Sequence, residues 1–413
     1  MSGPQLTVVM PLLNQAAFLE ASVRSVMAQP VDLELVVMDG GSSDGSLPLL
    51  ARLAAEFAGR LRWFSATDNG PAQALNRAVA QARAPLLGWL PADDLYTPGA
   101  ATRAVEALQS RSDWDLVYGE GEHVDVAGRP LGRYPTLPPD TPLERFLEGC
   151  FVCQPTLFMR RQVWLDAGGV DESLRAAFDF ELWLRLFRRH AGRIGFIDQV
   201  QAQSRLHAGG ITLRERERVA LEGMQVLHRH LGSAPPEWLL THFEERLAQH
   251  PFAAQQELPS DSFAGLAERA GAWTDEAGRQ RLHDWLSKHQ GLRHCTAVLG
   301  LDCSADGWLP PVSTLRLRAA PAAKTRLELE FEHAHPQGMP LKMEIFGPQG
   351  WQLGHEQRTN GSFGVTLSLP RLHDQERLIW TIKAGPGFVP SAVEPGSQDH
   401  RQLALRIRRI DLA

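Results

Sequence analysis

Cysteine is scarce in this chain, whose 413 residues include only four. Such low usage argues against a disulfide framework and is typical of reduced thiols in a cytoplasmic enzyme. Cys150 and Cys153 have the C-x-x-C spacing that occurs in metal sites. The other two cysteines, Cys295 and Cys303, do not repeat that spacing, so the sequence does not predict a zinc site.

An excess of positive charge and long apolar runs are also lacking. The 42 Lys and Arg residues are outnumbered by 48 Asp and Glu residues, and the net charge of −6 does not indicate a nucleic-acid partner. No apolar run reaches the roughly 18–20 residues that span a bilayer, and the first residues show no basic or apolar signal segment. We therefore expect a cytoplasmic protein without a transmembrane segment, and peripheral contact with the inner face of the cell membrane stays open.

The most informative stretch is 84–96, which reads Ala-Pro-Leu-Leu-Gly-Trp-Leu-Pro-Ala-Asp-Asp-Leu-Tyr. Its apolar part predicts a buried strand that ends just before Asp93 and Asp94. In open α/β sheets, ligands bind at the carboxyl ends of strands, and carboxylates there can hold Mg²⁺ or Mn²⁺ against a diphosphate. The alternative is an ordinary turn, because Asp also favours turns and helix N-caps.

Short apolar segments alternate with helical patterns through the N-terminal part of the chain. We expect strands at 6–10, 33–38, 61–64 and 85–90, and helices at 16–28, 47–57 and around 74–82. This alternation with short loops predicts an α/β fold with a mainly parallel sheet and helices on both faces. A nucleotide site is then expected along the carboxyl edge of the sheet.

Three segments in order carry a resemblance to a known family. Residues 36–46 read Val-Val-Met-Asp-Gly-Gly-Ser-Ser-Asp-Gly-Ser, 88–94 read Gly-Trp-Leu-Pro-Ala-Asp-Asp, and 178–186 read Phe-Asp-Phe-Glu-Leu-Trp-Leu-Arg-Leu. Together they resemble the inverting, nucleotide-sugar-dependent glycosyltransferases of family 2, which have the GT-A fold. Segments 153–161, 168–172 and 204–209 resemble the acceptor-side segments and the closing loop of that family. The resemblance runs from about residue 6 to about residue 212.

The resemblance implies a nucleotide-sugar site formed by the first two strand ends. Asp39 would accept a hydrogen bond from the nucleotide base, and Pro11 and Asn14 would line the same site. Many members of the family have a second acid where this chain has Gly40, so recognition of the base is expected to differ here.

The resemblance also implies a divalent metal, Mn²⁺ or Mg²⁺. Asp94 would be the direct metal ligand, and Asp93 would contact the sugar or ribose hydroxyls. The chain has Pro91 where the family's longer acidic motif begins, which leaves the number of direct ligands open. From the closing loop, His207 would reach the metal or diphosphate, and Arg205 would neutralise phosphate charge.

For the chemical step, the resemblance implies that Asp179 is the catalytic base. One carboxylate must take the proton of the acceptor hydroxyl as that oxygen attacks the anomeric carbon. Two alternatives remain, since Asp179 also suits a helix N-cap and Glu181 is a second candidate base, although Arg185 is spaced to pair with it. Gln154 and Trp183 are expected on the acceptor side.

The rest of the chain differs in pattern. We expect a glycosyltransferase domain at 1–212, a helical region at 213–291, and an antiparallel β-sandwich at 292–413, where the hydrophobic period changes to two. The β-sandwich is expected to be non-catalytic and to serve glycan binding or assembly, which includes a homo-oligomer. Of its aromatic residues, core packing is favoured for most over a sugar-stacking platform.

The sequence therefore predicts an enzyme that moves a sugar from a nucleotide-sugar, most simply a UDP-sugar, to an acceptor hydroxyl. The expected acceptor is a glycan or lipid-linked glycan in bacterial surface polysaccharide synthesis. A nucleotidyltransferase is a second reading, but it would usually carry a glycine-rich basic loop at 11–14, which reads Pro-Leu-Leu-Asn. A third reading is a glycan-binding or scaffold protein with a degenerate transferase domain. Pro91 and Gly40 favour it, and the retained acids argue against it.

Overall fold

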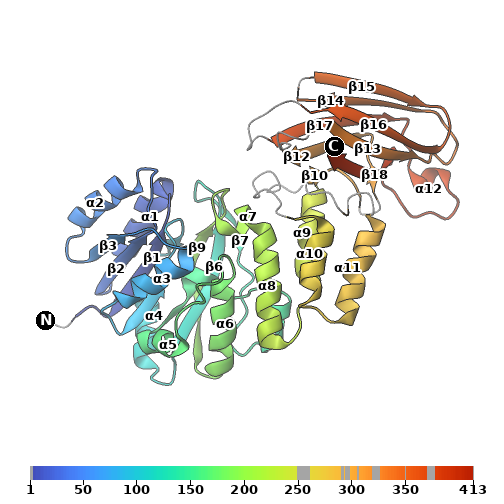
Figure 1. Ribbon diagram of the computed structural model, residues 1–413. Coiled ribbons are helices and arrows are strands. Elements are labelled where there is room, and N and C mark those ends of the chain that lie inside the picture. Colours follow the sequence, from blue (N-terminus) through green and yellow to red (C-terminus); the bar gives the residue numbers. More distant parts are fainter. Residues whose placement is uncertain are drawn as a thin grey trace. The chain divides into compact units, whose positions relative to one another are not determined.

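The chain divides into two compact units, Met1–Thr212 and Leu213–Ala413. The computed structural model describes residues 3–248, 261–289, 293, 298–304, 307–318, 326–348, 350–369 and 377–412 (Figure 1). Within these residues, no helix is both long enough and apolar enough to cross a membrane.

The first unit is built around one mixed sheet. Its elements are β1 (Leu6–Leu12), α1 (Ala16–Met27), β2 (Leu33–Asp39), α2 (Ser46–Glu56), β3 (Leu61–Ser65), α3 (Pro71–Ala80), β4 (Leu86–Trp89), β5 (Leu95–Tyr96), α4 (Ala100–Ser110), β6 (Leu116–Val124), β7 (Pro130–Arg133), the 3₁₀ turns η1 (Leu143–Leu147) and η2 (Gln154–Thr156), β8 (Phe158–Arg160), α5 (Arg161–Ala167), α6 (Phe178–Arg189), β9 (Ile194–Arg205) and α7 (Ile211–Arg214). In the described part of the chain, nine strands pair in the order β3-β2-β1-β4-β8-β6-β9-β5, with β7 beside β6.

The central strands of this sheet are mostly apolar and buried, and helices cover both faces. Along β1, alternate residues such as Val8 and Met10 enter a core shared with α1, α2 and α4. Val9 points to the opposite face, where it borders a small cavity together with Val79 of α3 and Trp164 of α5. A strand that is buried on both faces carries apolar side chains at most positions, which is why little alternation is visible in its sequence.

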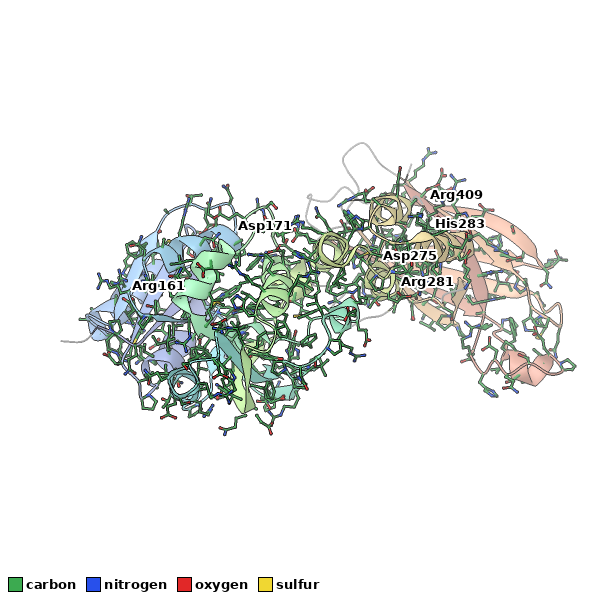
Figure 2. All side chains as sticks on the ribbon, turned by 90° about the horizontal axis from the view of Figure 1, so that it is seen from below. Arg161, Asp171, Asp275, Arg281, His283 and Arg409 are labelled. Carbon is green, nitrogen blue, oxygen red and sulfur yellow. The ribbon has the colours of Figure 1, made fainter. Side chains whose placement is uncertain are left out.

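The sheet is parallel only in part, which differs from the sequence-based expectation. β3, β2, β1 and β4 run parallel to one another, as expected, and β6 is parallel to β9. β8 lies between these two groups and is antiparallel to both β4 and β6. It is a three-residue strand that runs directly into α5, so its sequence carries too little pattern to indicate its direction. At this junction Arg161, labelled in Figure 2, donates from its backbone nitrogen to Pro85 O at 2.8 Å.

The second unit begins with helices. They are α8 (Arg216–Leu231), α9 (Glu237–Leu247), α10 (Phe263–Gly271) and α11 (Glu276–Lys288). Ser262 and Asp275 cap the last two, because each side chain accepts a hydrogen bond from the backbone nitrogen three residues later. Phe243, Phe263 and Trp285 pack their rings together between α9, α10 and α11.

Two antiparallel sheets complete this unit. Their strands are β10 (Val298–Leu301), β11 (Trp308–Leu309), β12 (Val312–Arg318), β13 (Arg326–His333), β14 (Leu341–Gly347), β15 (Gly350–Gln357), β16 (Gly361–Ser368), β17 (Arg377–Gly385) and β18 (Leu405–Leu412), and the short helix α12 (Pro390–Val393) precedes β18. One sheet has the order β10-β12-β17-β14-β15 and the other β11-β18-β13-β16. A stacked ring pair, His355 with Phe363 at 4.1 Å, joins β15 of the first sheet to β16 of the second.

These sheets confirm the predicted fold class, an α/β domain with an antiparallel β module at the C-terminal end. Along β13, Leu327, Leu329 and Phe331 are buried, while Glu328 and Glu330 are exposed, as the period of two predicts. The proposed boundary at 291–292 lies outside the described residues, as does Cys295. The division of the second unit into a helical region and a sandwich therefore stays a prediction.

Candidate active site

The loops that follow β1 and β2 are held together at the carboxyl edge of the sheet. Asn14, with φ of 53°, is the only non-glycine residue in the described ranges with a positive φ. Its backbone nitrogen donates to Ser42 Oγ at 2.8 Å, and its side-chain oxygen accepts from Ser43 N at 2.8 Å. Pro11, half-buried, pairs with Met38 in the parallel register. Pro11 and Asn14, the two residues at the end of β1 that were predicted to line the nucleotide-sugar site, therefore lie beside the loop after β2.

Asp39 is the last residue of β2 and is completely inaccessible to solvent. Its carboxylate accepts hydrogen bonds from Gly41 N at 3.0 Å, Ser42 N at 3.2 Å and Ser65 Oγ at 2.7 Å. The side chain thus organises the loop after β2 and ties it to the end of β3. Its predicted contact with the base requires this loop to open, because no atom of the residue is exposed.

Asp93 and Asp94 lie between β4 and β5 and contact the end of β9. Asp94 Oδ1 accepts from Arg205 N at 2.8 Å. Asp93 Oδ2 lies 2.9 Å from His207 Nε2. The structure therefore brings together the acidic pair and the two residues of the predicted closing loop, which are more than a hundred residues away in the sequence.

The Asp94 carboxyl is buried, being 5% exposed, and lies next to a second acid. Burial raises its pKa well above the usual range, and the charge of Asp93 raises the pKa further. The Arg205 backbone and charge, with a hydrogen bond from Ser204, act in the opposite direction. The site therefore has a shortage of positive charge close to two carboxyl groups.

Arg205 contributes its charge from a fixed position. Its guanidinium donates to three backbone oxygens, Asp93 O at 3.0 Å and Asp125 O and Val126 O, both at 2.9 Å. It also lies over the Phe18 ring of α1, with Cζ 4.9 Å from the ring centroid. The side chain is 9% exposed, so in this arrangement it braces the loop and does not extend toward a phosphate.

A divalent cation fits the chemistry of this cluster. Among the described residues, no group of three or more His, Cys, Asp or Glu side chains is arranged to hold a metal. The carboxyl groups of Asp93 and Asp94 are nevertheless adjacent, and carboxylate oxygens suit Mn²⁺ or Mg²⁺. The raised pKa of Asp94 shows that its negative charge is poorly compensated by the protein, which a bound cation would correct.

Asp179 is a half-buried residue in the first turn of α6. Burial raises the pKa of its carboxyl from its usual 3.8 to about 6, although a hydrogen bond from Phe180 N to Oδ1, at 2.7 Å, lowers it in part. The N-cap position is occupied by Ala177, so the alternative interpretation of Asp179 as an N-cap is wrong. A carboxylate with a pKa near 6 is ionised at neutral pH and still basic enough to accept a proton.

The second candidate base is engaged elsewhere. Glu181 is 4% exposed, and both of its oxygens accept from Arg185, at distances of 2.6 and 2.9 Å. Arg185 also donates to Ala167 O at 2.6 Å and Gly169 O at 2.8 Å. This buried ion pair fixes α6 to the end of α5, and it leaves Asp179 as the open carboxylate of this helix turn.

A buried thiol connects the acidic pair with Asp179. The pKa of Cys153 is raised well above its usual range by burial first and then by the charge of Asp94, with smaller contributions that include Asp179. The pKa of Cys150 is raised to about 12 by burial and by the charge of Asp179. Both carboxylates are therefore close enough to influence one small region between them. Sequence analysis did not place these cysteines in the site, because their C-x-x-C spacing suggested only a metal pair.

The two predicted acceptor-side residues differ in exposure. Gln154 is partly exposed in η2, and its amide nitrogen donates to Trp89 O at 3.0 Å, at the end of β4. Trp183 is fully buried and lies 6.2 Å from the Trp89 ring centroid. Trp183 is part of the buried packing next to the site, so it could support the residues that contact an acceptor but could not itself contact the acceptor.

Comparisons with known proteins point in one direction. Residues 7–168 match the sequence model of the family described as Glycosyl transferase family 2. The chain is 31% identical over 193 residues to the PGL/p-HBAD biosynthesis glycosyltransferase of Mycobacterium bovis (strain BCG / Pasteur 1173P2), covering 46% of this chain and 73% of that protein.

Two further similarities are more limited. An uncharacterized glycosyltransferase of Rickettsia conorii is 26% identical over 218 residues, which cover 49% of this chain but only 34% of the length of that protein. The crystal structure of S. aureus TarS 1-349 in complex with UDP-GlcNAc has a TM-score of 0.49 at 18% identity, covering 68% of this chain and 86% of that one. The structural similarity is too low to carry an argument.

Proposed function

We propose a reaction for this chain, which belongs to glycosyl transferase family 2. The chain transfers a sugar from a nucleotide-sugar to a hydroxyl of an acceptor, with inversion of the anomeric configuration. The observation that supports this most is the pair of acidic sites near Cys153. One is Asp179, with a pKa of about 6, and the other is the Asp93–Asp94–His207 cluster. A single-displacement transfer needs one base on the acceptor side and charge compensation on the donor side.

In the chemical step, the Asp179 carboxylate takes the proton of the acceptor hydroxyl. The acceptor oxygen forms a bond to the anomeric carbon from the side opposite the nucleotide. The bond from that carbon to the phosphate oxygen breaks, and its electron pair leaves with the nucleoside diphosphate. No proton donor is needed for this leaving group when its charge is compensated.

Asp94 is the residue that would hold the divalent cation, Mn²⁺ or Mg²⁺, with Asp93 and His207 beside it. A bound cation would supply charge compensation for the leaving diphosphate. Arg205 keeps the loop in place, through its backbone nitrogen to Asp94 and its guanidinium to Asp93 O. These contacts position both acids from a segment that is more than a hundred residues away in the sequence.

Pro11, Asn14 and the loop after β2 would line the donor nucleotide, most simply a UDP-sugar. Gln154 would lie on the acceptor side, because it is partly exposed beside the end of β4. We propose as acceptor a glycan or lipid-linked glycan in bacterial surface polysaccharide synthesis, reached from the cytoplasmic side. Within the described residues of the second unit, no cluster of possible metal ligands is found, and we assign this unit a role in glycan binding or assembly.

Replacing Asp179 by Asn tests the proposal. The amide keeps the size of the side chain and can still accept from Phe180 N, but it cannot take a proton at neutral pH. We expect nucleotide binding to persist and transfer to fall by roughly 10²-fold or more. Asp113→Asn is the matched control, because Asp113 is exposed in the loop after α4 and pairs with Arg111 at 2.7 Å. Equal turnover of wild type and Asp179→Asn would contradict the assignment.

A further inference from the structure

A donor site at this edge of the sheet needs an acceptor group for the base, and Asp39 is poorly placed for it. The residue has no solvent exposure. Its Oδ1 accepts from Ser42 N at 3.2 Å, and its Oδ2 accepts from Gly41 N, Ser42 N and Ser65 Oγ. Because this carboxylate is fully enclosed and engaged by its own loop, it can contact a ligand only if the loop moves.

A second carboxylate lies directly above the same loop. Asp68 follows β3 by three residues and is partly exposed. Its Oδ1 accepts from Gly70 N at 2.8 Å, and no hydrogen-bond partner is found for its Oδ2 among the described residues. A Cβ atom added to Gly40 would lie only 2.6 Å from this Oδ2. Asp68 thus presents its free oxygen in the space that any side chain at position 40 would fill.

The segment before Asp68 supports this placement. Ala66 N donates to Asp39 O at 3.0 Å, and a Cβ atom added to Gly41 would lie 3.6 Å from Thr67 Oγ1. The loop after β3 therefore lies along the loop after β2, at the carboxyl ends of two parallel strands. In α/β sheets this is the edge where nucleotides bind.

We infer that Asp68 is the residue that reads the nucleotide base, with Gly40 leaving the room for its carboxylate. The inference rests on the proposed function. An ionised carboxylate only accepts hydrogen bonds, so it selects a base edge that offers N–H donors. Uracil has its imide N–H there, and guanine has a ring N–H and an amino group. Cytosine offers only its amino N–H, beside a ring nitrogen that is an acceptor and repels a carboxylate. The ligand class is therefore a nucleoside diphosphate of uridine or guanosine, with cytidine disfavoured.

The test is calorimetric titration of UDP, GDP and CDP, each with Mn²⁺, into the full-length wild-type protein and into Asp68→Asn. The amide oxygen of Asn can still accept from Gly70 N, while the other position becomes a donor. We expect the affinity for whichever of UDP or GDP the wild type binds to fall by about tenfold or more, and CDP affinity to stay equal or rise. Asp113→Asn is the control for loss of a charge, since Asp113 is exposed and pairs with Arg111 at 2.7 Å.

A second variant removes no charge. Gly40→Ala places a methyl group against Asp68 Oδ2, and because Gly40 does not have a positive φ, alanine fits its backbone. The account predicts a similar loss of UDP or GDP affinity. Wild-type affinity in either folded variant would overturn the role of Asp68 and leave the proposed function intact. If the wild type binds none of the three nucleotides, the proposed function fails and this inference fails with it.

Discussion

Loss of the Asp179 charge should make the protein more stable at neutral pH while it removes activity. Burial raises the pKa of this carboxyl from 3.8 to about 6, and each pKa unit corresponds to about 1.4 kcal/mol, so ionisation in the folded state costs about 3 kcal/mol. Between pH 4 and 6 the unfolded chain has already released this proton and the folded protein has not. The contribution of Asp179 to stability therefore falls as pH rises through this window and is constant above it.

Urea unfolding of wild type and Asp179→Asn at several pH values measures this effect. The two proteins should be equally stable near pH 4, and the Asn variant should gain up to about 3 kcal/mol above pH 6. In wild type, transfer activity should fall about tenfold for each pH unit below 6, because only the ionised carboxylate accepts a proton. The reasoning is refuted if the stability difference is independent of pH and the variant turns over donor at the wild-type rate.

Four other substitutions test three separate parts of the structure. Asp94→Asn should weaken nucleotide diphosphate binding in the presence of Mn²⁺ to the level seen for wild type after chelation, measured by calorimetry, and equal binding in the two proteins with Mn²⁺ would remove Asp94 from the site. Glu181→Gln removes the charged partner of Arg185, whose side chain is 27% exposed and keeps two backbone acceptors. The free energy of unfolding should fall by about 1.5–3 kcal/mol, and a change below about 0.5 kcal/mol would show that the pair is unimportant. Trp380→Ala, in the core of the β module, should cost about 3–5 kcal/mol, whereas Trp351→Ala, 61% exposed, should leave stability unchanged and weaken glycan retention in affinity electrophoresis. If Trp351→Ala and wild type migrate equally in glycan-containing gels, a sugar-stacking role for Trp351 is contradicted.

The local pattern of the sequence was sufficient to predict the parallel part of the sheet. Apolar segments of the right length were expected at 33–38 and 61–64, and the structure has strands at Leu33–Asp39 and Leu61–Ser65. The acid that follows a buried strand could also be placed at the sheet edge, since parallel strands end on the same side. The period of two identified the C-terminal sheets for the same reason, because one face of each strand is buried.

What the sequence could not predict depends on contacts between distant segments. The exposure of Asp39 is decided by Ser65, which lies in another strand, and the position of Arg205 is decided by backbone oxygens of Asp125 and Val126. The sequence pattern did not single out Asp68 as a site residue. Its free oxygen becomes visible only when the loops after β2 and β3 are seen together, with Gly40 between them.

The central claim is that this chain releases a nucleoside diphosphate from a nucleotide-sugar and inverts the sugar. Incubation with a panel of UDP-sugars and GDP-sugars, Mn²⁺ and a glycan acceptor, followed by proton and phosphorus NMR, tests it most directly. The account predicts that the nucleoside diphosphate is released, that release stops on chelation, and that the transferred sugar has the opposite anomeric configuration to the donor. Retention of configuration, or release of pyrophosphate in place of the nucleoside diphosphate, would contradict it.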